Sequence, residues 1–244
     1  MANGLVRKAA LFGFALIGAE VAYAILRPAP RLPEFDPSGE FGDPSNPTVR
    51  IAVLGDSSVT APGVRHPDEI WIRIAVRRLA EQRHVVLASQ AVGGSKAVDV
   101  RNGQLHAALE FQPDIAVISV GANDAIRGVP LRRFENDLDH TVAALRDSGA
   151  AVILSGVGDL GTIPRLHEPL RSLMTARSLA YHRVHQKVAE RHGAIVAEHR
   201  NDDRTLWLRD RSLWSEDLFH VSALGHARWA EYAIRALQPV LSDG

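Results

Sequence analysis

Three polar residues, far apart in the chain, are of the types that nucleophilic catalysis requires. Ser57 directly follows the mainly apolar stretch IAVLGD at 51–56, and Asp217 and His220 lie three positions apart in DLFH. A serine hydroxyl is a weak nucleophile unless a histidine accepts its proton and a carboxylate fixes the tautomer of that imidazole. His226 lacks an acid three residues earlier, so it is the weaker candidate base. A D-x-x-H sequence alone is more typical of a surface loop, so the prediction depends on further groups.

Two other segments carry donors for the oxyanion that forms when a carbonyl is attacked. SQAVGGSKA (89–97) contains glycines, which let a backbone N–H approach a ligand closely. SVGANDAIRG (119–128) contains Asn123, whose side-chain amide is a donor. Each segment alone has the composition of a turn. Their occurrence after consecutive predicted strands favours a shared role at one carbonyl.

The elements that must position these residues alternate along the chain from residue 49 onward. Predicted strands cover 49–54, 84–89, 114–120, 150–156 and, more weakly, 194–199, and predicted helices lie near 68–83, 97–111, 131–148, 171–192 and 222–240. This alternation predicts an α/β fold, a three-layer α/β/α sandwich with a five-stranded parallel sheet in one domain over 49–244. In a doubly wound sheet the site lies beyond the carboxyl ends of the strands. Ser57 and Asn123 would therefore face one crevice.

The first 48 residues differ in composition from the rest. A basic start precedes an apolar run over 9–26 that only Glu20 interrupts. The run is just short of the roughly 20 residues that span a bilayer, so residues 1–27 are predicted to be a membrane anchor or a cleaved secretory signal, with membrane association through 9–26. The catalytic domain would then lie outside the cytoplasm; a soluble amphipathic helix in a cytoplasmic protein is the alternative. Residues 28–48, rich in Pro, Gly, Ser and Asp, predict a tether.

Composition excludes several functional classes. Lys+Arg and Asp+Glu both total 28, and no long basic stretch occurs, so no nucleic-acid partner is expected. The chain has no cysteine, which excludes disulfides, zinc-thiolate sites and a cysteine nucleophile. His182 and His185 share a helical face without an evident third ligand, which favours helix surface or packing over a metal site. No metal or organic cofactor is expected.

Four short segments together resemble a known family. They are GDSS at 55–58, AVGG with Gly94 at its end, GAND at 121–124 and DLFH at 217–220. In order and separation they are similar to the four sequence blocks of the GDSL-type, or SGNH, hydrolase family. The resemblance spans roughly residues 49–240. It implies a flavodoxin-like three-layer sandwich, in agreement with the fold that periodicity predicts.

The resemblance also implies a role for each matching residue. Ser57 would be the nucleophile, His220 the base and Asp217 the carboxylate that orients it. The oxyanion hole would consist of the backbone N–H groups of Ser57 and Gly94 with the side-chain amide of Asn123. No cofactor is implied.

Some positions depart from the family pattern or carry other expectations. Ser58 stands where the family name implies leucine, a change expected to affect packing rather than chemistry. Gly93 is the alternative to Gly94 as a donor. Asp56 and Asp124 are expected to brace their loops by hydrogen bonds.

A serine esterase acting on lipid, lysophospholipid or small acyl esters is the first functional hypothesis. An O-acetylesterase or acyltransferase on cell-envelope glycans is the alternative within the same fold, and a membrane-tethered binding domain without turnover is the alternative from another class. Candidate substrate contacts are Asp124, Arg165 in the long connection 156–172, and Trp214. Trp214, with Trp207, would either wall an acyl pocket or cover the edge of the core.

Overall fold

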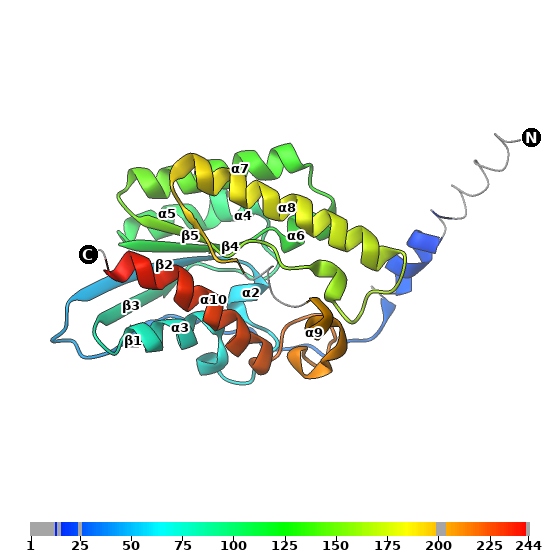
Figure 1. Ribbon diagram of the computed structural model, residues 1–244, viewed down its shortest axis with the longest axis horizontal. Helices are drawn as coiled ribbons and strands as arrows, with labels where there is room; N and C mark the ends of the chain where they lie inside the picture. Colours follow the sequence, from blue (N-terminus) through cyan, green and yellow to red (C-terminus); the bar gives the residue numbers. More distant parts are fainter. Residues whose placement is uncertain (1–12, 14–15, 24–25, 199–203, 243–244) are drawn as a thin grey trace, which may run out of the picture.

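A six-stranded sheet forms the middle layer of the computed structural model, and helices cover both of its faces (Figure 1). The structure describes residues 13, 16–23, 26–198 and 204–242. The strands are β1 (Gly39–Phe41), β2 (Thr48–Gly55), β3 (His84–Ser89), β4 (Ile115–Ser119), β5 (Ala151–Leu154) and β6 (Ile195–Val196). Their order is β1-β3-β2-β4-β5-β6; β1 pairs antiparallel with β3, and the other pairings are parallel. This confirms the three-layer α/β sandwich that the sequence predicts.

Helices of two groups cover the two faces of the sheet. They are α2 (Ser57–Thr60), α3 (Trp71–Leu79), α4 (Ala97–Asp99), α5 (Leu105–Glu110), α6 (Ala122–Arg127), α7 (Leu131–Asp147), α8 (Leu170–His192), α9 (Arg204–Arg209) and α10 (Ala223–Ser242), with a π-helical turn at Val100–Gln104 and 3-10 turns at Pro67–Glu69, Leu160–Thr162 and Arg211–Leu213. α5, α7 and α8 pack on one face, and α3 and α10 on the other (Figure 1). The longer helices match the predicted ones. The short helices α2, α6 and α9 are too brief to show an apolar period.

The apolar sequence of β2 follows from its place near the centre of the sheet. Ala52 and Leu54 belong to the hydrophobic cluster on the α7–α8 face, and Ile51 and Val53 to the cluster on the α3–α10 face. Successive side chains of a strand point to opposite faces, and here both faces are covered, so all four are fully buried. The polar residues after Gly55 therefore mark the point at which the chain leaves the core.

Part of the segment 28–48 belongs to the sheet, which corrects the prediction that it forms a tether and that the sheet has five strands. β1 adds an antiparallel edge to β3, with Gly39 opposite Leu87 and Phe41 opposite Val85. Phe41 is buried. A strand of three residues is too short to show the alternation by which strands are found in a sequence.

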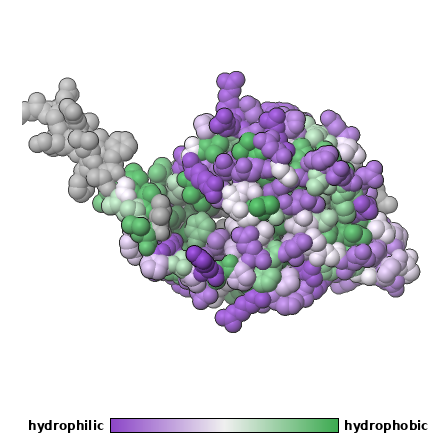
Figure 2. Space-filling model, turned by 180° about the vertical axis from the view of Figure 1, so that it is seen from behind, coloured by the Kyte–Doolittle hydropathy of each residue, from purple (hydrophilic) through white to green (hydrophobic). Residues whose placement is uncertain are grey.

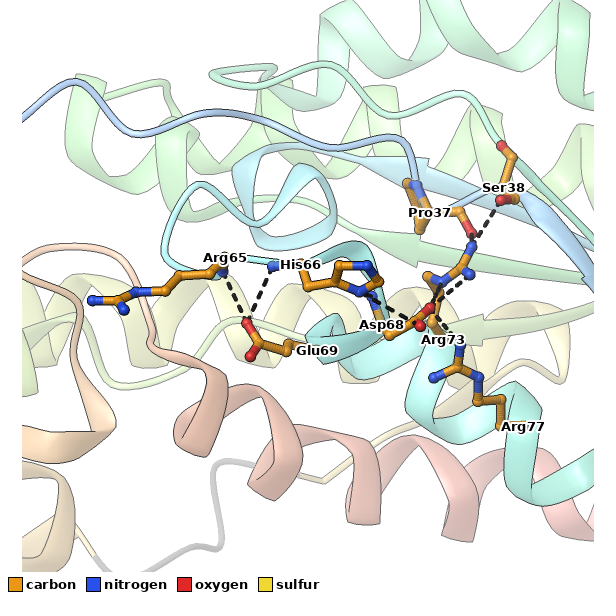
Figure 3. Close-up of polar contacts among 8 residues, drawn as sticks. All are labelled: Pro37, Ser38, Arg65, His66, Asp68, Glu69, Arg73 and Arg77. Atoms are coloured by element: carbon orange, nitrogen blue, oxygen red, sulfur yellow. Dashed lines mark hydrogen bonds and ion pairs between the residues drawn. The ribbon is translucent and has the colours of Figure 1, made fainter.

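Side-chain contacts also hold the residues just before β1 against α3 (Figure 3). Arg73 donates through Nη1 to the carbonyl oxygens of Pro37 and Ser38, at 3.1 and 2.9 Å. The same guanidinium bonds to Asp68 through Nη2 at 2.8 Å, and Arg77 also contacts that carboxylate. The hydrogen bonds from Arg77 and Arg73 lower the pKa of Asp68 to about 2. This ion pair orients Arg73 toward the segment.

The N-terminal apolar run, predicted to associate with a membrane, lies partly outside the described residues. Within the part that is described, the structure has no helix with the length and apolar character needed to cross a membrane. Residues 16–23 are helical, and the Glu20 carboxylate accepts a hydrogen bond from the backbone N–H of His167 at 2.8 Å. Leu16 and Leu26 are exposed. Figure 2 shows hydrophobic residues gathered on the side of the domain where this segment joins it.

Candidate active site

Ser57 is placed by the end of β2 and the first turn of α2. Gly55 packs so closely on β4 that a Cβ there would lie 2.2 Å from the carbonyl oxygen of Ser119, so only glycine fits. Asp56 then caps α2, because its Oδ1 accepts a hydrogen bond from the backbone N–H of Ser58 at 2.9 Å. Ser57 is thus the first residue of a capped turn at the carboxyl end of a central strand.

Asn123 and Gly94, the predicted oxyanion donors, lie on segments that are hydrogen-bonded to the end of β2. Asn123 is in the first turn of α6, and its Nδ2 donates to Oδ2 of Asp56 at 3.1 Å. One hydrogen of the amide is therefore held by the residue before Ser57, and the second remains available. Gly94 has a φ of +78° in a loop that is joined to β2 by a hydrogen bond from Val92 N–H to the Gly55 carbonyl, at 3.2 Å.

Asp217 and His220 are in direct contact. Oδ2 of Asp217 lies 2.6 Å from Nδ1 of His220. Oδ1 accepts hydrogen bonds from the backbone N–H groups of Phe219 and His220, both at 2.9 Å, and from the hydroxyl of Ser215 at 2.6 Å. Burial alone would raise the pKa of Asp217, but these bonds, that of His220 first, outweigh it and hold the pKa below its ordinary value. The carboxylate is therefore ionised and fixed in orientation.

The loop that carries this pair is irregular and is held by contacts rather than by a strand or helix. Leu218 has a φ of +61°, a left-handed conformation that is unusual for a side chain of this kind. Arg165 lies behind the loop: its backbone N–H donates to the Leu218 carbonyl at 3.1 Å, and its Nη1 donates to the Asp217 carbonyl at 2.9 Å. The structure therefore places Arg165, a predicted substrate contact, buried against the loop backbone and outside the lining of the cavity described below.

Two further carboxylates are buried near Ser57. Burial raises the pKa of Asp56 above its ordinary value, although Ser58 and Asn123 donate to it. Asp124 accepts a hydrogen bond from the backbone N–H of Ala97 at 3.0 Å, and burial raises its pKa to about 6. Asp124, the second predicted substrate contact, is likewise 1% exposed and joins α6 to α4.

A cavity of about 360 Å³ brings two of the predicted residues together, because Ser57 and His220 both line it; Gly94, Asn123 and Asp217 are not part of its lining. The four tryptophans of the chain also line it: Trp71, Trp207, Trp214 and Trp229. The Trp207 ring centroid lies 5.5 Å from that of Trp214 and 6.2 Å from that of Trp229. Trp214 is thus in the cavity wall, where the sequence places a candidate substrate contact. The sequence alone does not indicate that Trp71 and Trp229 line a site, because an aromatic residue in a helical pattern is typical of a core.

His182 and His185 lie inside the fold on α8. Both are buried; His182 Nε2 lies 3.4 Å from Oε2 of Glu198, and His185 Nδ1 lies 3.2 Å from the carbonyl oxygen of Tyr181. No three His, Asp or Glu side chains group as a metal site within residues 16–23, 26–198 and 204–242.

Comparison of the sequence with known proteins identifies relatives. Residues 53–228 match the model of the GDSL-like lipase/acylhydrolase family. A GDSL-like esterase of Mycobacterium tuberculosis is 29% identical over 203 residues, which cover 80% of this chain and 63% of that protein. The chain thus spans less than two thirds of the length of this relative.

Solved structures show the same fold at low sequence identity. The crystal structure of TesA superposes with a TM-score of 0.65 at 23% identity, over 78% of this chain and 99% of that one. A mutant of Axe2, an acetyl-xylooligosaccharide esterase from Geobacillus, gives a TM-score of 0.64 at 18% identity, over 79% of this chain and 95% of that one. Because the family model covers most of the chain and the fold agrees, the chain belongs to the GDSL-like lipase/acylhydrolase family.

Proposed function

We propose that the chain is a serine esterase that cleaves carboxylic esters through an acyl-enzyme on Ser57. The main support is the contact of 2.6 Å between Asp217 and His220 at the wall of a cavity that Ser57 also lines. A serine and an imidazole that line one cavity, with a carboxylate bonded to that imidazole, are the groups that nucleophilic ester cleavage requires.

Asp217 sets the direction of proton transfer. Its Oδ2 accepts a hydrogen bond from the Nδ1–H group of His220, which leaves Nε2 as the basic atom. His220 then removes the Ser57 proton as the hydroxyl oxygen attacks the ester carbonyl, and it returns that proton to the leaving alcohol. Water activated by the same imidazole attacks the acyl-enzyme and releases the acid. The ionised Asp217 stabilises the imidazolium in both steps.

Three N–H groups would stabilise the tetrahedral oxyanion. The N–H of Ser57 is in the first turn of α2, where helical N–H groups have no intrahelical acceptor. The Gly94 N–H and the second amide hydrogen of Asn123 are the others. Asp56 acts here as a positioning residue, because its bond to Nδ2 of Asn123 fixes the plane of the amide. Each well-placed donor contributes about 2.7–4 kcal/mol to transition-state stabilisation.

The lining of the cavity favours esters with an apolar part. Tryptophan rings and aliphatic side chains make up much of its wall, and such surfaces bind acyl groups by removing them from water. Lipid, lysophospholipid and small acyl esters are the substrate classes that we propose.

Hydrolysis of p-nitrophenyl acetate by the full-length chain tests the proposal. Ser57→Ala is expected to lower the rate about 10³-fold or more and to abolish covalent labelling by a fluorophosphonate. Ser45→Ala, at an exposed serine, is the matched control and should retain both properties. Equal turnover by wild type and Ser57→Ala would reject the nucleophile, and absence of turnover and labelling would favour a binding domain. An acyltransferase would instead form a new ester when an alcohol is added.

A further inference from the structure

His226 is a buried histidine in the wall of the catalytic cavity that the mechanism above does not use. It lies on α10 and is 2% exposed. The backbone N–H of Trp71 donates to its Nδ1 at 3.4 Å, so the proton of the neutral ring is on Nε2. Burial, and then the nearby charge of His220, lower the pKa of His226 to about 3, so the ring is neutral near pH 7.

The Nε2–H group of His226 is a donor without an acceptor in the described part of the chain. His226 lines the cavity, and a donor that faces a cavity without a partner in the chain can bond a ligand or water there. Because Trp71 holds Nδ1, the ring cannot exchange its donor and acceptor without losing that bond. His226 therefore presents a fixed donor to the cavity.

Three serine hydroxyls form a row on the same side of the sheet. Ser58 Oγ lies 2.6 Å from Ser119 Oγ, and Ser155 Oγ donates to Ser119 Oγ at 2.7 Å. Ser119 and Ser155 each come two positions after a residue that packs on the α3–α10 face, Val117 and Ile153, so they point toward that layer. All three serines line the cavity.

The three serine hydroxyls have one proton more than their mutual hydrogen bonds use, so the row can also donate to a ligand. Three hydroxyl protons are present and the two hydrogen bonds that link the row use two of them, so one proton is left to donate. If Ser119 donates to Ser58, the remaining proton is on Ser58, whose hydroxyl also contacts the Asp56 carboxylate, so a ligand oxygen competes with that carboxylate for the proton. Ser58 stands at the position where the family name implies leucine.

Aromatic rings complete the wall around these donors. Trp71 donates its indole Nε1 to the Ser58 carbonyl at 2.7 Å, which leaves apolar ring surface toward the cavity. The Trp229 ring lies edge-on to His226 at 5.4 Å between centroids. We name His226, Ser58, Ser119, Ser155, Trp71 and Trp229 the His226 subsite.

We propose that the His226 subsite binds an uncharged oxygen on the acyl group of the ester, such as the hydroxyl of a hydroxyacyl chain. The donors of His226 and the serine row match an acceptor oxygen, and the buried aromatic wall disfavours a charged group. The acyl group, rather than the alcohol, occupies this buried wall because it stays on Ser57 until deacylation, whereas the alcohol must leave. The proposal rests on the proposed esterase function and specifies its substrate class.

Two esters that differ by one hydroxyl group test the proposal: p-nitrophenyl 3-hydroxybutyrate and p-nitrophenyl butyrate. The ratio of their kcat/KM values does not depend on the fraction of enzyme that is active, so partial unfolding of a variant does not alter it. The wild-type ratio is expected to exceed one, and His226→Phe and Ser58→Ala should each lower it by about three- to tenfold, the effect of one lost hydrogen bond. His106→Gln, at an exposed histidine, is the matched control and should keep the wild-type ratio.

A wild-type ratio at or below one, or ratios that neither variant changes, would overturn this proposal. Hydrolysis of both esters would still depend on Ser57 in that case, so the esterase proposal would stand. Failure of the chain to hydrolyse either ester through Ser57 would overturn both proposals together.

Discussion

The two ends of the candidate site are positioned by different means. Ser57 follows β2, a strand that is buried on both faces, so the packing of the core determines where this serine lies. Asp217 and His220 lie in an irregular loop that is held by hydrogen bonds to side chains and backbone. We therefore expect changes in the core to affect stability first, and changes around the loop to affect turnover first.

The buried carboxylates at the two ends differ in the same way. Near Ser57, burial dominates and raises the pKa values of Asp56 and Asp124. At the loop, hydrogen bonds from His220, Ser215 and the backbone outweigh burial, and the pKa of Asp217 is lowered. A carboxylate that must remain charged beside an imidazole is thus surrounded by donors. Those beside the serine have fewer donors and serve to join loops.

The largest effect is expected from Asp217→Asn. The variant amide can still accept from the backbone N–H groups of the loop, but it presents no anion to Nδ1 of His220. We expect kcat for p-nitrophenyl acetate to fall about 10⁴-fold with little change in the melting temperature. Activity within tenfold of wild type would show that Asp217 does not orient the base.

Leu54→Ala tests whether the core around β2 affects stability rather than turnover. Leu54 is fully buried in β2, so its truncation should lower the free energy of unfolding in urea by about 2–5 kcal/mol. Turnover per fluorophosphonate-titrated active site should stay near the wild-type value. Leu224→Ala, at an exposed leucine, is the control and should change stability by less than about 0.5 kcal/mol. A large loss of turnover per titrated site would mean that core packing and catalysis are not separable.

Arg165→Met tests whether the Arg165 side chain positions the loop that carries Asp217 and His220. The change removes the donor to the Asp217 carbonyl, so we expect kcat to fall about 10- to 30-fold, the effect of a lost charged hydrogen bond, while KM stays within twofold. Arg165→Lys keeps the charge and should recover part of kcat. A rise in KM at constant kcat would instead place Arg165 at the substrate, as the sequence predicts.

The smallest effect is expected in the pH dependence of the unfolding free energy, through the carboxyl group of Asp124. Because the pKa of Asp124 is raised from 3.8 to about 6 in the folded state, the native protein binds this proton more tightly than the unfolded chain does. The resulting stability is complete at pH values below 3.8 and is lost as pH rises through about 6. Asp124→Asn should therefore reduce the fall in unfolding free energy between pH 5 and pH 8 by about 1 kcal/mol in urea titrations. Identical pH dependence in both proteins would contradict this.

The sequence predicts the core elements well because their signals are local. β2 is found from its apolar residues 51–54, and the pair Asp217 and His220 from a spacing of three residues together with the other family blocks. Contacts between distant segments have no such signal. Nothing near Arg165 in the sequence indicates that its side chain turns back to a carbonyl 52 residues later. The bond between Asp56 and Asn123 likewise depends on β2 and β4 being neighbours, which follows from strand order and not from either segment.

Short elements and single aromatic residues are also hard to predict, because they show no local pattern that distinguishes them. β1 has three residues, too few for a period, and a proline- and glycine-rich neighbourhood conceals it. Trp71 and Trp229 sit in helical patterns that describe a core equally well. They become cavity walls because α3 and α10 pack together on the same face of the sheet.

The placement of all four indoles around one cavity gives the molecule a built-in optical reporter. Near-ultraviolet emission of the unlabelled protein originates from the walls of the site, so occupation by a non-hydrolysable ester analogue should alter its intensity and wavelength. Replacing the tryptophans one at a time by phenylalanine would then reveal beside which ring a bound molecule rests.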